Sequence, residues 1–208
     1  MAKSKIRNKP PGLFEKMVRQ HPFKTYLHIG LIGIGLLFLF CIVAFQLTKT
    51  PGFVLPQFQF PKAFVVSTFI LMLSSIVLGN ITYLYDSDKI VTVKDNLLIT
   101  LLLGIAFMIS QFVGWRELVN SGIKLNGYVS GSYLYVISGL HIFHLFGGLV
   151  FIYVEFIRIW QKSKDPVKSL IYLTDPYQKL KLEMIRIYWN FMDILWVGIF
   201  FYFFFLFD

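Results

Sequence analysis

Two histidines, His141 and His144, lie inside the apolar segment GSYLYVISGLHIFHLFGG, residues 131 to 148. An imidazole can ligate a metal or haem iron, carry a proton, or hydrogen-bond to a neighbouring helix. A spacing of three residues places both rings on one face of a helix. Because ionisable groups at membrane depth are costly and usually face protein, the pair marks either a site or a helix contact.

Haem ligation would require two histidines at the same depth on different helices. His28 is the only other histidine in an apolar segment, and it lies near the opposite end of its segment. Its depth differs from that of His144 by roughly 15 Å at about 1.5 Å per residue. A metal would need carboxylates or thiolates at the level of the histidines, where the other segments offer mostly Leu, Ile and Phe. Both cofactor interpretations are weakened, which favours two neutral histidines that hydrogen-bond at a helix contact.

Two acidic residues belong to the last apolar segment. Asp193 lies roughly 10 Å beyond Arg186 along a helix, so its carboxyl group is neutral, paired with a donor on another helix or subunit, or part of a proton route. Glu183 is expected at the membrane boundary, within reach of water or lipid headgroups.

Other polar and small residues are expected at contacts between helices. Glu155 precedes Arg158 by three residues, which predicts an ion pair at the membrane edge. Gly139, Gly147 and Gly148 narrow their helix, so a neighbouring backbone can approach closely. The expected hydrogen-bonding groups between helices are Ser67, Thr68, Ser74 and Ser75, and Gln111 and Arg116 cluster toward the outer end of their own predicted helix.

The composition is that of an integral membrane protein: 56% of residues are hydrophobic and 15% are charged, and the mean hydropathy is +0.66. A spanning helix needs about 20 mainly apolar residues. Such windows cover residues 25–47, 63–85, 96–118, 132–160 and 185–207. We therefore expect an all-α fold, with a basic segment at 1–24 and one five-helix transmembrane domain at 25–208.

The distribution of Lys and Arg predicts the orientation in the membrane. Sixteen of the 20 lie in residues 1–24, in the connection at 89–94, and in residues 158–186. The positive-inside rule then places the N-terminus in the cytoplasm and Asp208 outside. The first apolar window is longer than the core of a signal peptide, so we expect it to be retained.

The remaining features narrow the function classes. The net charge of +9 is explained by a basic cytoplasmic face near anionic lipids, so no nucleic-acid partner is expected. Cys41 is the one cysteine and lies in an apolar window, which indicates a small apolar residue. No catalytic, cofactor-binding or metal-binding residue is predicted. Transport is poorly supported because there is no repeat or pair of broken helices.

Three segments share the pattern of a known family. Residues 131–148 carry glycine, hydroxyl, aromatic and histidine residues at matching positions, and YWNFMDILW at 188–196 follows Glu183 at the matching distance. STFILMLSS at 67–75 supplies the small hydroxyl residues. From about Lys24 onward the chain resembles subunit III of the haem-copper terminal oxidases, in the five-helix form that lacks two N-terminal helices. The matching residues are Gly131, Ser132, Tyr135, Ser138, Gly139, His141, His144, Gly147, Glu183, Tyr188, Trp189, Asp193 and Trp196.

Two positions depart from the family pattern. Asn190 stands where the family has a histidine, which retains hydrogen bonding and removes a group that titrates near neutral pH. The first predicted helix, 25–47, has no acidic residue, whereas the family usually has a buried carboxylate there, associated with lipid and proton access. Its role is then absent or supplied by other groups.

The resemblance implies an accessory subunit that packs directly on oxidase subunit I in a bacterial cytoplasmic membrane. It implies that haem and copper reside in partner subunits, that structural phospholipid is bound, and that the chain supports proton uptake and sustained turnover. Other oxidase subunits, and a respiratory supercomplex, are further expected partners. Alternatives are a membrane cytochrome b and a small membrane transporter. The predicted structural, lipid-contact or subunit-contact residues are His141, His144, Glu183, Asp193, Tyr188, Trp189, Asn190, Trp196, Gly139 and Ser138.

Overall fold

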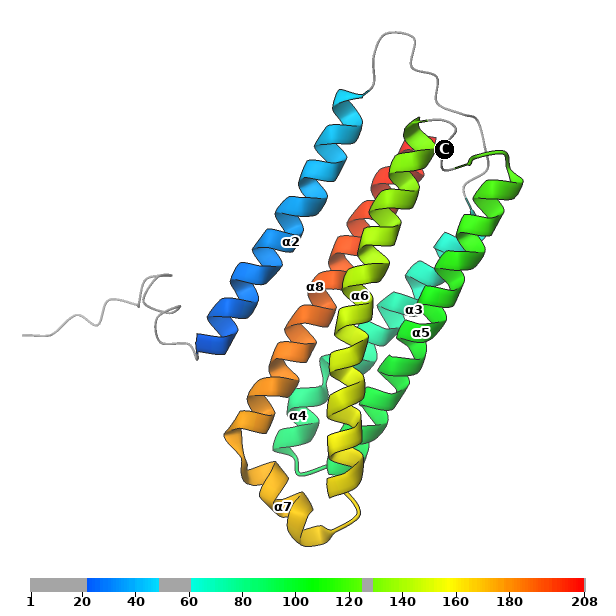
Figure 1. Ribbon diagram of the computed structural model, residues 1–208. Helices are drawn as coiled ribbons and strands as arrows, with labels where there is room; N and C mark the ends of the chain where they lie inside the picture. The colour runs from blue at the N-terminus through cyan, green and yellow to red at the C-terminus, as the bar shows by residue number, and fades with distance from the viewer. Residues whose placement is uncertain (1–21, 49–60, 125–128, 208) are drawn as a thin grey trace, which may run out of the picture.

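The computed structural model describes residues 22–48, 61–124 and 129–207, and the regular structure within these ranges is entirely helical (Figure 1). The helices are α2 (Pro22–Leu47), α3 (Lys62–Gly79), α4 (Ile81–Asp86), α5 (Ile90–Asn120), α6 (Val129–Lys162), α7 (Pro166–Thr174) and α8 (Pro176–Phe207).

Five stretches of the described chain are long and apolar enough to cross a membrane. They are α2, the α3–α4 pair, α5, residues 131–162 of α6 and residues 176–206 of α8, and each contains or nearly coincides with one predicted window. The all-α fold with five candidate spans is therefore confirmed. Residues 1–21 of the predicted basic segment lie outside the described residues.

Four long helices, α3, α5, α6 and α8, lie side by side as a bundle, and α2 leans against its edge (Figure 1). In the most apolar window of α2, only 11% of residues are buried, against 33% to 39% in the other four spans. Most of the α2 surface is therefore not covered by the other described helices.

The buried side chains of α2 form a single narrow seam. Leu31, Phe38 and Phe45 are the buried residues of this helix, and their spacing of seven keeps them on one face over successive pairs of turns. Phe45 packs against Tyr133 of α6 and Phe203 of α8, with ring centroids 5.3 Å and 5.9 Å away. A few large side chains thus attach α2 to two helices at once.

The second span is interrupted at Asn80. Its φ of −92° and ψ of 6° end α3 at Gly79, and α4 begins one residue later. Breaking a helix leaves carbonyl groups without their usual partners. Asn96 Nδ2 donates to Val77 O at 3.0 Å, and Arg186 Nη1 approaches Gly79 O at 3.5 Å. Side chains from α5 and α8 thus occupy carbonyls freed by the break.

Two aspartates start the helices at the α7 end of the bundle. Asp165 Oδ1 accepts from Val167 N at 3.0 Å as the N-cap of α7. Asp175 Oδ1 accepts from Tyr177 N at 2.9 Å at the start of α8. Each aspartate precedes a proline, whose fixed φ suits the first turn of a helix. The two caps set the sharp corners that join α6, α7 and α8.

Candidate functional site

Two tryptophans of α8 bind hydroxyl groups of α3 in the centre of the bundle. Trp189 Nε1 donates to Ser74 Oγ at 2.9 Å, and Trp196 Nε1 donates to Thr68 Oγ1 at 3.0 Å. Trp189 is 0% exposed and Trp196 is 2% exposed. A buried indole N–H needs an acceptor, so these hydroxyls allow two large rings to pack inside an apolar interface.

The hydroxyl groups can accept because their own hydrogens are used within α3. Ser74 Oγ donates to Leu71 O at 2.6 Å, and Thr68 Oγ1 donates to Phe64 O at 2.8 Å. A hydroxyl has one hydrogen and two lone pairs, so each oxygen remains free to accept an indole N–H. The bonds within α3 therefore leave each hydroxyl oxygen with a lone pair for an indole of α8.

Two further hydrogen bonds extend this polar contact on either side. Ser75 Oγ donates to Asn190 Oδ1 of α8 at 2.8 Å, and Gln111 Nε2 of α5 donates to Ser67 Oγ at 2.7 Å. The prediction that the hydroxyl residues of this span hydrogen-bond between helices is confirmed. Asn190 is half-buried and keeps the hydrogen-bonding role expected of it.

His141 lies at the centre of an aromatic cluster. Its ring centroid is 4.9 Å from that of Trp196, 5.7 Å from that of Phe107 and 6.3 Å from that of Phe38. The residue is 0% exposed, and neither ring nitrogen hydrogen-bonds to a described residue. The sequence predicted a polar joint here, whereas the imidazole packs as one more ring between α2, α5 and α8.

His144 is half-buried one turn further along the same face of α6. Its Nδ1 lies 2.8 Å from Leu140 O of its own helix, and its ring centroid is 5.8 Å from that of Phe38. Phe38 thus touches both histidines, which confirms that they share a face. The link to another helix comes from the main chain, since Tyr188 Oη donates to His144 O at 2.7 Å.

Asp193 is 4% exposed, and both carboxylate oxygens lack a hydrogen-bond partner among the described residues. The hydroxyl of Ser75, the α3 residue bonded to Asn190 of α8, donates its hydrogen to Asn190 Oδ1 at 2.8 Å. The donor on a neighbouring helix that the sequence allowed for is therefore not seen in the described part of the chain.

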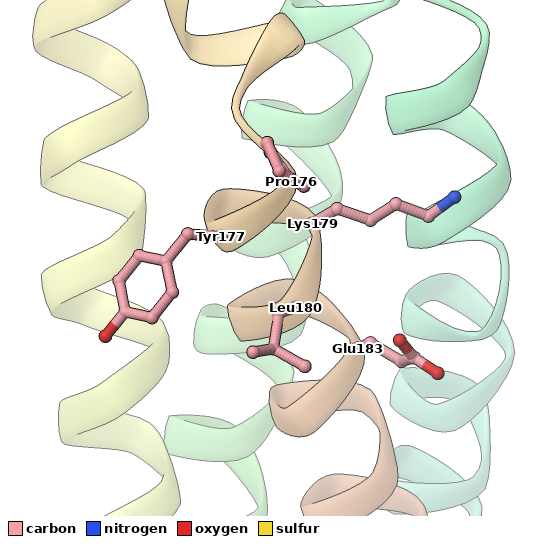
Figure 2. Close-up of a pocket in the computed structure, with 5 residues that line it drawn as sticks. All are labelled: Pro176, Tyr177, Lys179, Leu180 and Glu183. Carbon is pink, nitrogen blue, oxygen red and sulfur yellow. The ribbon is translucent and has the colours of Figure 1, made fainter. Parts of the chain in front are cut away.

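Glu183 forms an ion pair that joins two helices. Its Oε2 lies 2.6 Å from Lys24 Nζ of α2, and the two side chains are 28% and 21% exposed. Glu183 also lines a shallow recess of about 310 Å³ with Pro176, Tyr177, Lys179 and Leu180 (Figure 2). The partial exposure agrees with the predicted boundary position.

The glycines of α6 contact aromatic side chains, where the sequence predicted a neighbouring backbone. A Cβ atom on Gly148 would lie 2.7 Å from Tyr188 Cε1, and one on Gly139 would lie 3.6 Å from Trp115 Cζ2. Nothing lies within 4 Å of the Cβ position of Gly147. The small residues therefore make room for rings, because the large side chains of α5 and α8 hold the helix axes apart.

Ser138 repeats the hydroxyl arrangement of α3 at another contact. It is fully buried, donates to Leu134 O at 2.6 Å, and accepts from Trp115 Nε1 of α5 at 2.9 Å. Its hydrogen bond thus holds the Trp115 indole against α6 beside Gly139.

A second buried polar cluster lies at the α7 end of the bundle. Glu155 Oε2 pairs with Arg158 Nη1 at 3.3 Å, which confirms the predicted ion pair. Glu155 Oε1 accepts from Tyr172 Oη of α7 at 2.7 Å, and Tyr85 Oη donates to Tyr172 O at 2.7 Å. Burial, followed by the negative charge of Glu155, raises the pKa of Tyr172. Sequence reasoning missed Tyr172, because only the folding back of α7 brings it to Glu155.

Within the described ranges, no three His, Cys, Asp or Glu side chains gather closely enough to hold a metal ion. His141 and His144 lie on one face of a single helix, and His28 is exposed with Nδ1 2.6 Å from Lys24 O. The three histidines in the described ranges are therefore not placed on opposite sides of a haem plane.

The helices and their internal contacts define a multi-pass membrane protein whose buried polar groups mainly join helix to helix. The family model for cytochrome c oxidase subunit III matches residues 51–207. The chain belongs to the cytochrome c oxidase subunit III family, as the two late motifs predicted.

Several curated proteins are similar to the chain. The "Cytochrome c oxidase subunit 3" of Corynebacterium diphtheriae is 28% identical over 140 residues, which cover 67% of this chain and 63% of that protein. The "Probable cytochrome c oxidase subunit 3" of Nocardia farcinica is 30% identical over 102 residues, 49% of this chain and 45% of the relative. The "Probable quinol oxidase subunit 3" of Staphylococcus aureus is 27% identical over 143 residues, 69% of this chain and 66% of the relative. The matches thus span about half to two thirds of these relatives.

Proposed function

We propose that this chain is the accessory subunit III of a proton-pumping haem-copper terminal oxidase in aerobic respiration. It packs directly on subunit I, contains no redox centre, and supports proton uptake and sustained turnover of the complex. Its other proposed partners are the remaining oxidase subunits, membrane lipids and a respiratory supercomplex.

One observation carries this proposal. Trp189 and Trp196 of the α8 motif donate to Ser74 and Thr68 of α3, and all four residues lie in the region matched by the family model. The chemically distinctive groups of the motif are thus used to build the bundle, as suits a subunit that supports a catalytic partner.

The outer surface of the bundle favours contact with lipid or with apolar subunits. Phe69 and Ile76 of α3 are 68% and 70% exposed, and Ile109 of α5 is 59% exposed. Such side chains are stable in a membrane when acyl chains or another helix cover them. We infer that structural phospholipid occupies part of this surface and subunit I another part.

We further propose a bacterial cytoplasmic membrane as the location, with the N-terminus in the cytoplasm and Asp208 outside. The support is the bias of Lys and Arg toward one side of the spans. Reporter domains fused after Asp208 test the orientation. We expect activity from a fused reporter that works only outside the cytoplasm. Activity from a reporter that works only in the cytoplasm would contradict this orientation.

Affinity purification of the tagged chain in mild detergent tests the function. The expected product contains haem-bearing subunits identified by mass spectrometry, and it consumes oxygen with reduced cytochrome c or with a quinol. The two donors correspond to the two kinds of oxidase named among the relatives. Haem bound to this polypeptide alone would favour the cytochrome b alternative, and transport by the chain alone in liposomes would favour the transporter.

A further inference from the structure

Helix α7 leaves three large apolar side chains uncovered. Val167, Leu170 and Ile171 are 67%, 63% and 64% exposed. Their spacing of three and four residues places them on one face of the helix. Tyr172, which follows them, is 1% exposed and packs into the bundle. The helix therefore has one face fixed to the protein and one apolar face turned away from it.

The chain connections hold α7 at the end of two candidate membrane spans. Three residues, 163–165, separate it from α6, and Asp175 alone separates it from α8 (Figure 1). Because α6 and α8 both contain candidate spans, these short connections keep α7 within a few residues of the same-side ends of those two helices. A short helix at this level meets lipid headgroups and the upper acyl chains.

Two lysines lie in α7 or in the connection that precedes it. Lys164 Nζ lies 4.5 Å from the ring centroid of Trp160, and Trp160 is itself 46% exposed. Lys168 is paired with Asp165 at 3.5 Å, and its side chain remains 67% exposed. Lysine and tryptophan beside an exposed apolar stripe are typical of helices that lie in a membrane interface.

We propose that α7 is an in-plane membrane helix that binds anionic phospholipid. Val167, Leu170 and Ile171 enter the boundary between headgroups and acyl chains, while Lys164 and Lys168 approach the lipid phosphates. The bilayer surface is the occupant of this face, and the proposal does not depend on the oxidase assignment.

The contacts on the inner face of α7 fix its orientation toward the lipid. Tyr172 Oη donates to Glu155 Oε1 at 2.7 Å, and Tyr85 Oη donates to the carbonyls of Tyr172 and Asp175 at 2.7 Å and 2.8 Å. These bonds attach α7 to α6 and α4, and they attach Asp175, the residue before α8, to α4. The apolar face is thus presented by a helix that is held in place.

Fluorescence quenching in the purified, reconstituted protein tests the proposal. In a Cys41→Ser background, Leu170→Cys carries an environment-sensitive fluorophore, Val167→Cys provides a second site, and Lys89→Cys provides the control. Lys89 is an exposed residue in the α4–α5 connection at the same end of the bundle. The vesicles contain phosphatidylcholine and phosphatidylglycerol, with either lipid brominated, and iodide serves as the aqueous quencher.

Brominated lipid should quench the probes at 170 and 167, and iodide should quench the probe at 89. Brominated phosphatidylglycerol should quench more strongly than brominated phosphatidylcholine, since a lysine near an anionic surface gives roughly a fivefold preference. The double substitution Lys164→Gln and Lys168→Gln should remove that difference and leave quenching by brominated phosphatidylcholine. Quenching at 170 and 167 by iodide alone would overturn the proposal, as would protection from both quenchers, which indicates a covering subunit. Equal quenching by the two brominated lipids would overturn its anionic-lipid part.

Discussion

Lys24 and Glu183 form an ion pair 2.6 Å long between the first turns of α2 and the early part of α8. Near the other end of α2, Gln46 Nε2 donates to Tyr202 Oη of α8. Between these polar contacts, α2 is attached mainly through Leu31, Phe38 and Phe45. The helix least buried in the bundle is therefore fastened to α8 near both ends.

Glu183→Gln should loosen α2 while the rest of the bundle remains intact. A partly exposed ion pair contributes about 0.2–1 kcal/mol, so the expected effect is local. Hydrogen exchange in detergent should become faster in the first turns of α2. Lys179→Gln is the matched control, because it breaks an ion pair of the same length with Asp86 without touching α2. Equal acceleration in both variants would contradict the assignment.

Ser74→Ala should destabilise the α3–α8 contact. The substitution removes the acceptor of the Trp189 indole, and hydrogen bonds between membrane helices contribute roughly 0.6–2 kcal/mol. Thermal unfolding in detergent, followed by near-ultraviolet circular dichroism, measures the loss. Ser121→Ala is the control, since Ser121 is exposed and its hydroxyl donates only within its own turn. Unchanged stability of Ser74→Ala would show that this bond contributes nothing.

Gly148→Ala and Gly147→Ala should differ in sign although the two residues are adjacent. A Cβ at 148 would meet Tyr188 Cε1 at 2.7 Å, whereas the position at 147 is open. Overpacking costs about 1–3 kcal/mol, while alanine in an unobstructed helix gains up to about 1 kcal/mol over glycine. Melting temperatures of the two variants in one detergent provide the measurement. Two equal shifts would contradict the close contact with Tyr188.

His141→Leu should leave the protein as stable as before, or make it more stable. The imidazole lies among Phe38, Phe107 and Trp196 without a hydrogen bond to a described residue, so leucine of similar size removes polar atoms buried without partners. Stability, assembly with partner subunits and oxygen consumption should be measured together. A large loss of activity with stability retained would reveal a chemical role that the packing does not show.

Acidification should weaken the corner between α6 and α7. The hydrogen bond from the Val167 backbone N–H holds the pKa of Asp165 below its ordinary value of 3.8. Because the folded pKa is the lower one, this contribution is fully present above pH 3.8 and is lost as the pH falls through the folded pKa. Hydrogen exchange of α7, corrected for intrinsic rates, should therefore rise below that pH. Asp165→Asn keeps a capping side chain and should remove the part of this pH dependence that Asp165 contributes, whereas the part due to Asp175, whose pKa is also lowered by its hydrogen bonds, should remain.

Much of the fold was predictable because each membrane span is a continuous run of apolar residues in the sequence. A run of about 20 apolar residues is sufficient to predict a spanning helix, and all five windows correspond to candidate spans. The hydroxyl residues of α3 were also predictable as interhelical donors or acceptors, because lipid offers them no alternative partner. The break at Asn80 was not predicted, since no proline marks it and the freed carbonyls are bound by residues of α5 and α8.

The sequence by itself determined the class of protein, the number of spans and the family, because hydropathy and short motifs are properties of contiguous residues. Only the tertiary structure decided that His141 packs against rings, that Asp193 has no described partner, and that Tyr172 binds Glu155. It also decided which hydroxyl meets which indole, across 115 positions for Trp189 and 128 for Trp196. Such pairings depend on the rotation and axial shift of each helix against its neighbours, and these follow from the packing of all the side chains together.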